Sequence, residues 1–245
     1  DLRQGANPRV RDIPRAEPAP ERAQPRNGQV KVRYDLRAHQ PDVATFPRQL
    51  WLRAVREALT SATNADLGYV DERGIRQLRT EVSDYLGRAR GVVADPDRIV
   101  VTAGATHALS LIRRALDRRG ATRMAFENPS HRVLHAAAER AGQRPVGIPV
   151  DRKGLRSDML ADVEAALVSP AHQFPLGVAM SADRRAALVG WARGTGGLAV
   201  EDDYDAEFRY DQAPVGAVQG LAPEHVAYIG STGKTLAPAI RLGWA

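Results

Sequence analysis

The sequence predicts an α/β fold in which helices cover both faces of a mostly parallel sheet. From residue 31 onward, short segments rich in β-branched residues alternate with segments whose apolar residues recur every three or four positions. The chain has 245 residues, 43% of them hydrophobic, which suffices for one large domain or for a domain and a tail. Ligands of such a domain are expected at the carboxyl ends of its strands.

The individual elements follow from these patterns in chain order. Helical spacing of apolar residues predicts helices over residues 49–62, 74–91, 106–119, 131–142, 157–166 and 181–194. Short apolar runs predict strands over residues 98–104, 123–129, 144–150, 166–170, 197–204 and 225–231, and the closing segment RLGWA begins another strand. Because a domain of this class rarely ends on a strand that has just begun, we expect the domain to be truncated here.

Residues 1–30 differ in composition from the rest of the chain. They carry scattered charges, few large apolar residues and five prolines, namely Pro8, Pro14, Pro18, Pro20 and Pro25. Such a segment cannot bury enough apolar surface to order itself, so we expect a disordered interdomain linker here and one domain over residues 31–245. The chain lacks an initiator Met, which indicates a start inside a longer reading frame.

Composition argues against several classes of protein. No apolar run reaches the roughly eighteen residues that a transmembrane helix needs. The lack of cysteine excludes a disulfide framework and thiolate metal sites, and it fits a reducing cytoplasm. The net charge of +6 would suit a nucleic-acid neighbour. The basic residues are nevertheless spread along the chain without a basic block, which favours an ordinary solvated surface.

Lysine is rare in this chain. Only three of the 35 basic residues are lysine, namely Lys31, Lys153 and Lys234. Arginine keeps its proton near neutral pH and cannot form an imine, whereas lysine can. Lys234, in the segment YIGSTGKTLAP, is therefore our candidate for amine chemistry. On composition alone, an ordinary surface lysine is the alternative.

Two other enzyme classes use a lysine in a similar setting, and the pattern argues against both. A P-loop nucleotide site needs four residues between its glycines, but only Ser231 and Thr232 separate Gly230 from Gly233. The Ser-x-x-Lys arrangement of penicillin-recognising enzymes is present, but its further motifs would have to follow downstream, where the chain ends. The α/β alternation upstream does not suit that class either.

A pyridoxal phosphate site has four requirements, and the sequence offers candidates for each. Lys234 offers an amine to the cofactor aldehyde. Asp202, near the end of a predicted strand, can face the pyridine nitrogen, and Tyr204 can reach the ring oxygen. The phosphate is expected at the start of the helix over residues 106–119, where free amides attract an anion. Its predicted ligands are Gly104, Ala105, Thr106, Ser231 and Arg241.

The order of these motifs resembles a known family. The segments VTAGATHAL, ENPSH, SPAHQFPLG, AVEDDYDAEFRYD and YIGSTGKTLAPAIRLGW are similar to the aminotransferase-like domain of the MocR subfamily of GntR-type transcriptional regulators. The likeness extends from Tyr34, through PDVATFPRQLW and GYVDERGIRQLR, to the last residue. It implies a fold-type-I, pyridoxal-phosphate-binding domain that forms homodimers. It also implies a linker to an N-terminal winged helix-turn-helix that binds DNA and lies outside this chain.

The resemblance further implies a role for each matching residue. Lys234 matches the lysine that forms an imine with the cofactor, and Asp202 matches the partner of the pyridine nitrogen. Tyr204 matches the donor to the ring oxygen, and Arg241 matches a phosphate ligand. Tyr69 matches a residue that reaches the phosphate of the neighbouring subunit, so the site would be complete only in a dimer.

The sequence also departs from the family pattern. His131 stands where a tyrosine stacks on the cofactor ring, and imidazole offers less area for that contact. His39 stands where a glycine usually lets a substrate carboxylate approach. Gly233 and Ala103 each replace a serine and remove a hydroxyl group.

A further departure lies in the segment AHQFPLG. Phe174 falls where aminotransferases keep an asparagine against the ring oxygen, and either Gln173 or His172 is a candidate to compensate. The arginine that grips a substrate carboxylate normally lies in a C-terminal small domain, which this chain does not contain.

Three functions remain open on the sequence. The first is an effector-sensing and dimerisation domain of a cytoplasmic, DNA-binding regulator, in which a small amine or amino acid displaces Lys234 from pyridoxal 5'-phosphate by imine exchange. The second is a pyridoxal-phosphate-dependent aminotransferase that acts on an amino acid, since one fold hosts many functions. The third is a degenerate dimerisation module that no longer binds the cofactor, which the lost hydroxyl groups and His39 would explain.

Overall fold

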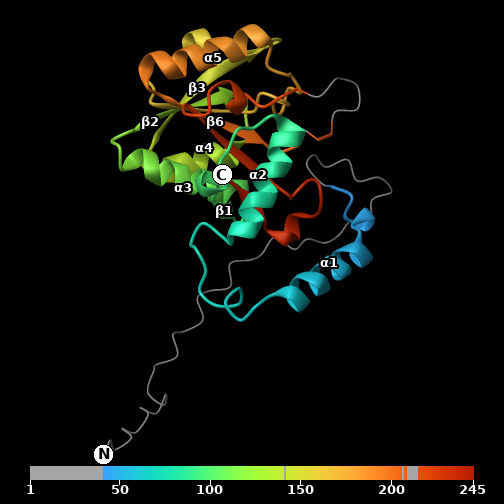
Figure 1. Ribbon diagram of the computed structural model, residues 1–245. Helices are drawn as coiled ribbons and strands as arrows, with labels where there is room; N and C mark the ends of the chain where they lie inside the picture. Colours follow the sequence, from blue (N-terminus) through green and yellow to red (C-terminus); the bar gives the residue numbers. More distant parts are fainter. Residues whose placement is uncertain (1–40, 141, 206, 209–214) are drawn as a thin grey trace, which may run out of the picture. The chain divides into compact units, whose positions relative to one another are not determined.

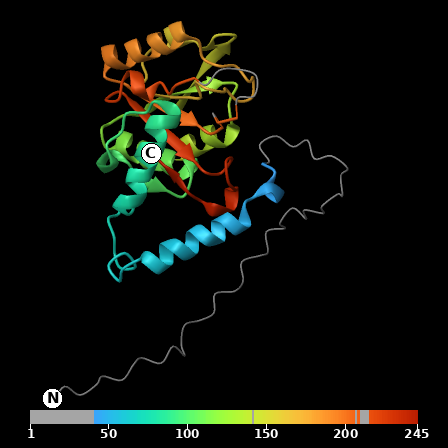
Figure 2. The ribbon, with the colours of Figure 1, turned by 45° about the vertical axis from the view of Figure 1, so that its right-hand side comes forward.

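Figures 1 and 2 show the computed structural model of the chain, which describes residues 41–245 except 141, 206 and 209–214. The predicted linker over residues 1–30 and the expectation for His39 lie outside the described residues. In the part of the chain that the structure describes, no helix has the length and apolar character that a bilayer span requires.

The described residues build one eight-stranded sheet in the order β1-β8-β7-β6-β5-β2-β3-β4. Strands β7, β6, β5, β2 and β3 run parallel, whereas β1, β8 and β4 pair antiparallel with their neighbours. The strands are β1 (Val101–Thr102), β2 (Arg123–Asn128), β3 (Arg144–Asp151), β4 (Gly154–Leu155), β5 (Ala165–Val168), β6 (Leu198–Asp203), β7 (Val226–Ser231) and β8 (Gly243–Trp244). The predicted mostly parallel α/β fold is confirmed.

Helices join or flank these strands. The α-helices are α1 (Arg48–Ser61), α2 (Arg76–Arg90), α3 (Ala105–Asp117), α4 (Arg132–Arg140) and α5 (Ala182–Thr195). Short 3-10 turns are η1 (Val43–Thr45), η2 (Pro96–Arg98), η3 (Ser157–Met159), η4 (Gln219–Leu221) and η5 (Pro238–Ile240). Five of the six predicted helices are confirmed, with ends shifted by no more than two residues.

Strand register assigns different helices to the two faces of the sheet. Ala125, Ala166 and Ala199 are paired across β2, β5 and β6, and they pack in one cluster with Leu188 and Val189 of α5. The residue that follows each of these alanines points to the opposite face and belongs to a second cluster with α3 and α4. Figure 1 shows α5 on one side of the sheet and α3 and α4 on the other.

The predicted helix over residues 157–166 is wrong. The structure has only the 3-10 turn η3 there, and β5 begins before the predicted helix would end. Asp162 has a positive φ of 51°, which a continuous helix does not allow. Leu160 and Val163 are nevertheless buried in the cluster that faces α5. The helix-like spacing therefore reflects two apolar anchors of an irregular connection.

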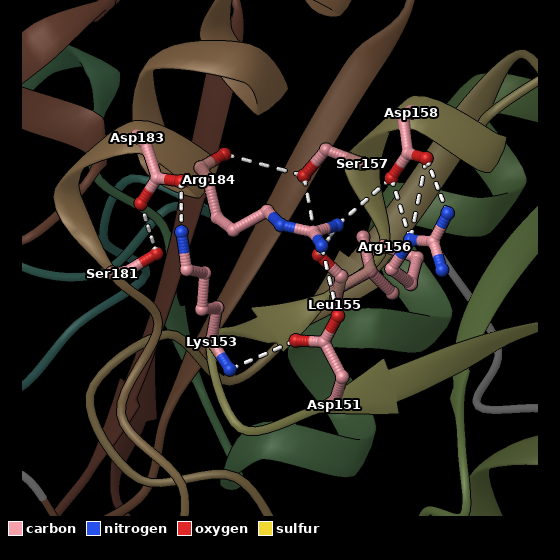
Figure 3. Close-up of polar contacts among 9 residues, drawn as sticks. All are labelled: Asp151, Lys153, Leu155, Arg156, Ser157, Asp158, Ser181, Asp183 and Arg184. Carbon is pink, nitrogen blue, oxygen red and sulfur yellow. Dashed lines mark hydrogen bonds and ion pairs between the residues drawn. The ribbon is translucent and has the colours of Figure 1, made fainter.

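Ion pairs at the surface tie the β3–β4 hairpin to α5, as Figure 3 shows. Arg184 of α5 contacts Asp151 and Asp158, each at 2.8 Å. Lys153 Nζ lies 3.1 Å from Asp183 Oδ2, and both side chains are well exposed. Exposed pairs of this kind contribute little each to the free energy of unfolding. Lys153 therefore has a role at the surface, which separates it from Lys234.

A buried ion pair fixes the end of β6. Asp203 Oδ2 accepts a hydrogen bond from Arg90 Nε at 2.7 Å and another from the Tyr228 hydroxyl at 2.6 Å. Both side chains of the Arg90–Asp203 pair are only 3% exposed, so removing either partner would leave a buried charge uncompensated. The pair joins α2 to β6 and so fixes the backbone next to Asp202.

Candidate functional site

A cavity of about 460 Å³ lies at the carboxyl ends of β2, β5, β6 and β7. The amino-terminal end of α3 and the segment between β7 and β8 complete its wall. This size is typical of small-molecule sites. All residues predicted for the site except Tyr69 line the cavity: Gly104, Ala105, Thr106, His131, Asp202, Tyr204, Ser231, Lys234 and Arg241.

Asp202 places a buried, unpaired oxygen in the cavity wall. Its Oδ1 atom is inaccessible to solvent and has no hydrogen-bond partner among the described residues. Burial, with smaller contributions from the neighbouring carboxylates Asp203 and Asp205, raises the pKa of Asp202 to about 7. A buried carboxylate needs a positively charged or hydrogen-bond-donating partner. The geometry therefore favours a ligand that brings such a group to Asp202.

The opposite end of the cavity is built for an anion. Gly104 is the N-cap of α3 and has a φ of 106°, which favours glycine, and no side chain of the described residues caps this helix start. A Cβ atom added to Gly104 would lie 3.5 Å from Nη2 of Arg241, so this guanidinium faces the helix start. Thr106 and Ser231 supply hydroxyl groups to the same wall. These donors match the needs of a phosphate group.

Lys234 lies in the turn that follows β7. Burial lowers the pKa of its amine, and the carboxylate of Asp205 partly opposes this shift. A lowered pKa increases the fraction of neutral amine, which is the form that attacks an aldehyde. Lys234 and Asp202 line one cavity, as the sequence predicted.

Tyr204 follows the end of β6, and burial raises the pKa of its hydroxyl above the usual range. The hydroxyl therefore keeps its proton at neutral pH and acts as a hydrogen-bond donor. The ring of His172 stacks on the ring of Tyr204 with centroids 6.0 Å apart and planes 20° apart. His172 Nδ1 in turn lies 2.7 Å from Asp205 Oδ2.

Gln173 and His172, the two candidates to compensate for Phe174, have different surroundings: His172 stacks on Tyr204, whereas Gln173 does not line the cavity. Gln173 is almost fully buried, and its amide donates to the carbonyl oxygens of Pro129 and Phe174, each at 2.7 Å. Its Oε1 accepts from the Leu176 amide at 3.1 Å. Gln173 thus joins its own loop to the segment that follows β2, whereas Phe174 lines the cavity beside His131, with ring centroids 5.6 Å apart.

Glu127 is a cavity residue that the sequence analysis missed. The carboxyl group lies at the end of β2, is 4% exposed, and has an Oε1 atom without a hydrogen-bond partner among the described residues. Burial raises the pKa of Glu127 to about 8, so this acid is mostly protonated at neutral pH. Its position, one residue before the segment NPSH, was the only available signal.

Tyr69 lies outside the cavity and is fully exposed. Its predicted contact with the phosphate of a neighbouring subunit requires a second chain and stays a prediction.

The residues present fit pyridoxal 5'-phosphate. The unpaired oxygen of Asp202 matches a protonated ring nitrogen, the Tyr204 hydroxyl matches the ring oxygen, and the amine of Lys234 matches the aldehyde. The start of α3 and Arg241 match the phosphate. Because the buried Oδ1 of Asp202 lacks a hydrogen-bond partner within the described part of the chain, the fit rests on an unmet chemical need as well as on shape.

Comparisons with known proteins agree with the geometry. The family description "Aminotransferase class I and II" matches residues 36–245. The solved kynurenine aminotransferase of Pyrococcus horikoshii superposes with a TM-score of 0.74 and 28% identity, covering 83% of this chain and 53% of that one. A solved archaeal alanine:glyoxylate aminotransferase gives a TM-score of 0.73 at 30% identity over the same shares.

Curated relatives include transcriptional regulators. The chain is 36% identical over 205 residues to the HTH-type pyridoxine biosynthesis transcriptional regulator PdxR of Corynebacterium glutamicum, covering 83% of this chain and 44% of that protein. It is 31% identical over 225 residues to the probable rhizopine catabolism regulatory protein MocR of Rhizobium meliloti, covering 91% and 45%. The chain thus spans less than half the length of these relatives, which confirm the resemblance to MocR-type regulators. By the family match over residues 36–245, the chain belongs to the class I and II aminotransferase family.

Proposed function

We propose that this chain is the pyridoxal-phosphate-binding, effector-sensing and dimerisation domain of a MocR-type, DNA-binding transcriptional regulator. The observation that carries the proposal is that Asp202, whose buried Oδ1 has no hydrogen-bond partner among the described residues, lines the same cavity as Lys234. The similarity to PdxR and MocR favours a regulator over an enzyme. The proposed domain covers residues 31–245, and a cytoplasmic location belongs to the same proposal.

Each cavity residue has a defined task in this proposal. Asp202 holds a positive charge at the ring nitrogen, and Tyr204 donates to the ring oxygen. Arg241 and the amides that begin at Gly104 bind the phosphate, assisted by Ser231, Ala105 and Thr106 at its periphery. His131, which lines the cavity beside Phe174, would offer its ring to the ring of the cofactor.

The cofactor supplies an aldehyde that condenses reversibly with amines and a ring that withdraws electrons. Lys234 provides the resident amine, and its lowered pKa keeps part of it neutral and able to exchange with an incoming amine. The effector is accordingly a small amine or an amino acid. An incoming amine would take the place of Lys234 at the cofactor aldehyde, and the freed Lys234 side chain would change the contacts of the turn between β7 and β8.

The partners follow from the same proposal. Tyr69, exposed in the single chain, would reach the phosphate of a second subunit in a homodimer. DNA would be bound by a winged helix-turn-helix outside these 245 residues. Residues 1–30 would connect the two domains.

Cofactor binding can be tested with two lysine variants. Adding pyridoxal 5'-phosphate to the intact protein should produce absorbance near 420 nm, which is roughly the range expected for an imine of this cofactor. Lys234→Ala should lose this band, whereas Lys153→Ala, which removes an exposed lysine bound to Asp183, should keep it. Equal spectra for the two variants would contradict the proposal.

An aminotransferase is the second candidate, because solved enzymes of that class share the fold at 28 to 30% identity. Steady turnover of an amino donor with a keto acid by the intact protein would favour the enzyme. A single, stalled exchange that changes the affinity for promoter DNA in a mobility-shift assay would favour the regulator. Tight cofactor binding by calorimetry would exclude the degenerate dimerisation module.

A further inference from the structure

We infer that His172 and Asp205 form a positioning pair that fixes the ring of Tyr204 in the cofactor cavity. This inference deepens the proposed function and rests on it. It concerns two residues outside the set predicted for the site, and it assigns them a task in binding the ring oxygen of the cofactor.

Tyr204 needs support because of its place in the chain. It directly follows the last residue of β6, so its backbone lies beyond the hydrogen-bonded part of the strand. A tyrosine ring turns about two side-chain bonds, and a donor that turns freely loses entropy when it binds a ligand. A ring packed against it would remove that cost in advance.

His172 provides this packing. Its imidazole plane lies within 20° of the Tyr204 ring plane, with centroids 6.0 Å apart, which is an offset stacked arrangement. The His172 side chain is 45% exposed, so burial alone would not hold it in one rotamer. Something else has to fix the imidazole.

Asp205 supplies that restraint. Its Oδ2 lies 2.7 Å from His172 Nδ1, and its side chain is only 18% exposed. Because Asp205 follows Tyr204 directly, the carboxylate and the stacked ring come from one short segment and hold His172 at two points. The group also lies near Lys234, whose ammonium form Asp205 stabilises electrostatically.

The two contacts make a specific chemical prediction. A Tyr204 hydroxyl that donates to the ring oxygen would stabilise the negative charge on that oxygen. It would thereby lower the pKa of the neighbouring proton-binding group of the bound cofactor. Loss of the hydrogen bond should therefore raise the midpoint of the pH titration of the band near 420 nm. The carboxyl groups of Asp202 and Glu127 also act on Tyr204, and Asp203, although bound to Arg90 and Tyr228, acts on Asp202. Each variant is therefore compared with the wild-type protein under the same conditions.

The test uses intact protein with pyridoxal 5'-phosphate. His172→Ala should weaken cofactor binding about threefold to tenfold, as expected for one side chain that must be ordered on binding. It should also raise the titration midpoint by about half a pH unit. His172→Phe keeps a flat ring against Tyr204 and should recover at least half of both losses. Asp205→Ala should weaken cofactor binding to a similar extent, and the double variant should bind no more weakly than either. The titration midpoint is compared for the His172 variants only, because the Asp205 carboxylate also acts directly on Lys234.

The Tyr204→Phe background separates positioning from general stability. If His172 acts through the Tyr204 hydroxyl, His172→Ala should leave the titration midpoint unchanged once that hydroxyl is absent. A midpoint shift of the same size in both backgrounds, no shift in His172→Ala, or a shift in His172→Phe as large as that in His172→Ala would overturn the inference. The proposed function fails separately, by persistence of the band in Lys234→Ala.

Discussion

The guanidinium of Arg241 faces Gly104 at the start of α3, within 3.5 Å of where a Cβ atom on that glycine would lie. Arg241 reaches this position from a left-handed backbone conformation, with φ 56° and ψ 41°. That conformation costs a residue other than glycine roughly 1 kcal/mol or more. The backbone conformation at position 241 would suit glycine better than arginine. Arginine is therefore present for its side chain, which points into the cavity.

Arg241→Gly should separate these two contributions. Glycine adopts the left-handed conformation without strain, so the free energy of unfolding of the cofactor-free protein should change by less than about 1 kcal/mol. Affinity for pyridoxal 5'-phosphate should fall about tenfold to a hundredfold, because a charge-assisted contact to the phosphate is lost. Urea unfolding and calorimetry measure the two quantities. An unchanged dissociation constant would remove Arg241 from the site.

Gly243 in β8 is expected to control the packing around Gly104, at the phosphate end of the cavity. A Cβ atom there would lie 2.7 Å from Gly104 Cα and 2.9 Å from Gly230 O, which no ordinary packing allows. Gly243→Ala should therefore destabilise the fold by about 1 to 3 kcal/mol and weaken cofactor binding. Gly190→Ala is the matched control in α5, where no atom lies within 4 Å, and it should stabilise the fold slightly. Equal denaturation midpoints for the two variants would contradict this packing.

Adjacent aspartates should respond in opposite ways. Asp202→Asn removes a negative charge from the cavity and should weaken cofactor binding about tenfold or more, with little loss of stability. Asp203→Asn breaks the buried pair with Arg90 and should cost about 3 kcal/mol of stability. Calorimetry measures cofactor binding by both variants, and thermal unfolding measures their stability. If Asp203→Asn weakened binding more than Asp202→Asn while leaving stability intact, the two roles would have to be exchanged.

Glu127 predicts a pH dependence of stability in the cofactor-free protein. The unfolded chain releases this proton near pH 4.5, whereas folded Glu127 keeps it until about pH 8. Across that interval the folded state binds more protons, so the free energy of unfolding falls as pH rises, by at most about 1.4 kcal/mol per pH unit for one group.

Glu127→Gln should flatten this dependence and leave the protein more stable than wild type at about pH 8. Burial also raises the pKa values of Asp202 and Glu201, each to about 7. In Glu127→Gln these two groups should still make the free energy of unfolding fall as the pH rises toward 7. Urea unfolding at about pH 6 and about pH 8 checks the difference. Glu57→Gln, at an exposed position of α1, serves as the control and should leave the slope unchanged.

Periodicity predicted the regular elements well because burial and spacing agree in them. In α3 and β2, for example, the apolar positions that suggested the element are the ones that pack in the core. The segment over residues 157–166 failed because Leu160 and Val163 have helical spacing without helical backbone. The antiparallel pairing of the two-residue strand β8 with β1 and β7 could not be predicted either, because so short a strand leaves no local pattern that fixes its partners or register.

The candidate site was predictable where a residue type is chemically unusual. Lys234 was conspicuous in a chain that otherwise uses arginine, and Asp202 and Tyr204 follow a clear strand. Glu127 was not assigned, and His172 was only one of two candidates to compensate for Phe174, because their proposed roles depend on burial and on partners far away in the sequence. No pattern in the sequence indicates that the carboxylate of Asp205 contacts His172 Nδ1.

The central claim is that Asp202 and Lys234 serve one bound pyridoxal phosphate, and covalent trapping tests it most directly. Borohydride reduces the carbon–nitrogen double bond to a stable secondary amine, so peptide mass spectrometry of the treated protein locates the attached group. The account predicts a phosphopyridoxyl group on Lys234, and a marked loss of this labelling in Asp202→Asn at limiting cofactor. Labelling on Lys153 or Lys31 instead, or equal labelling of Lys234 in Asp202→Asn, would contradict it.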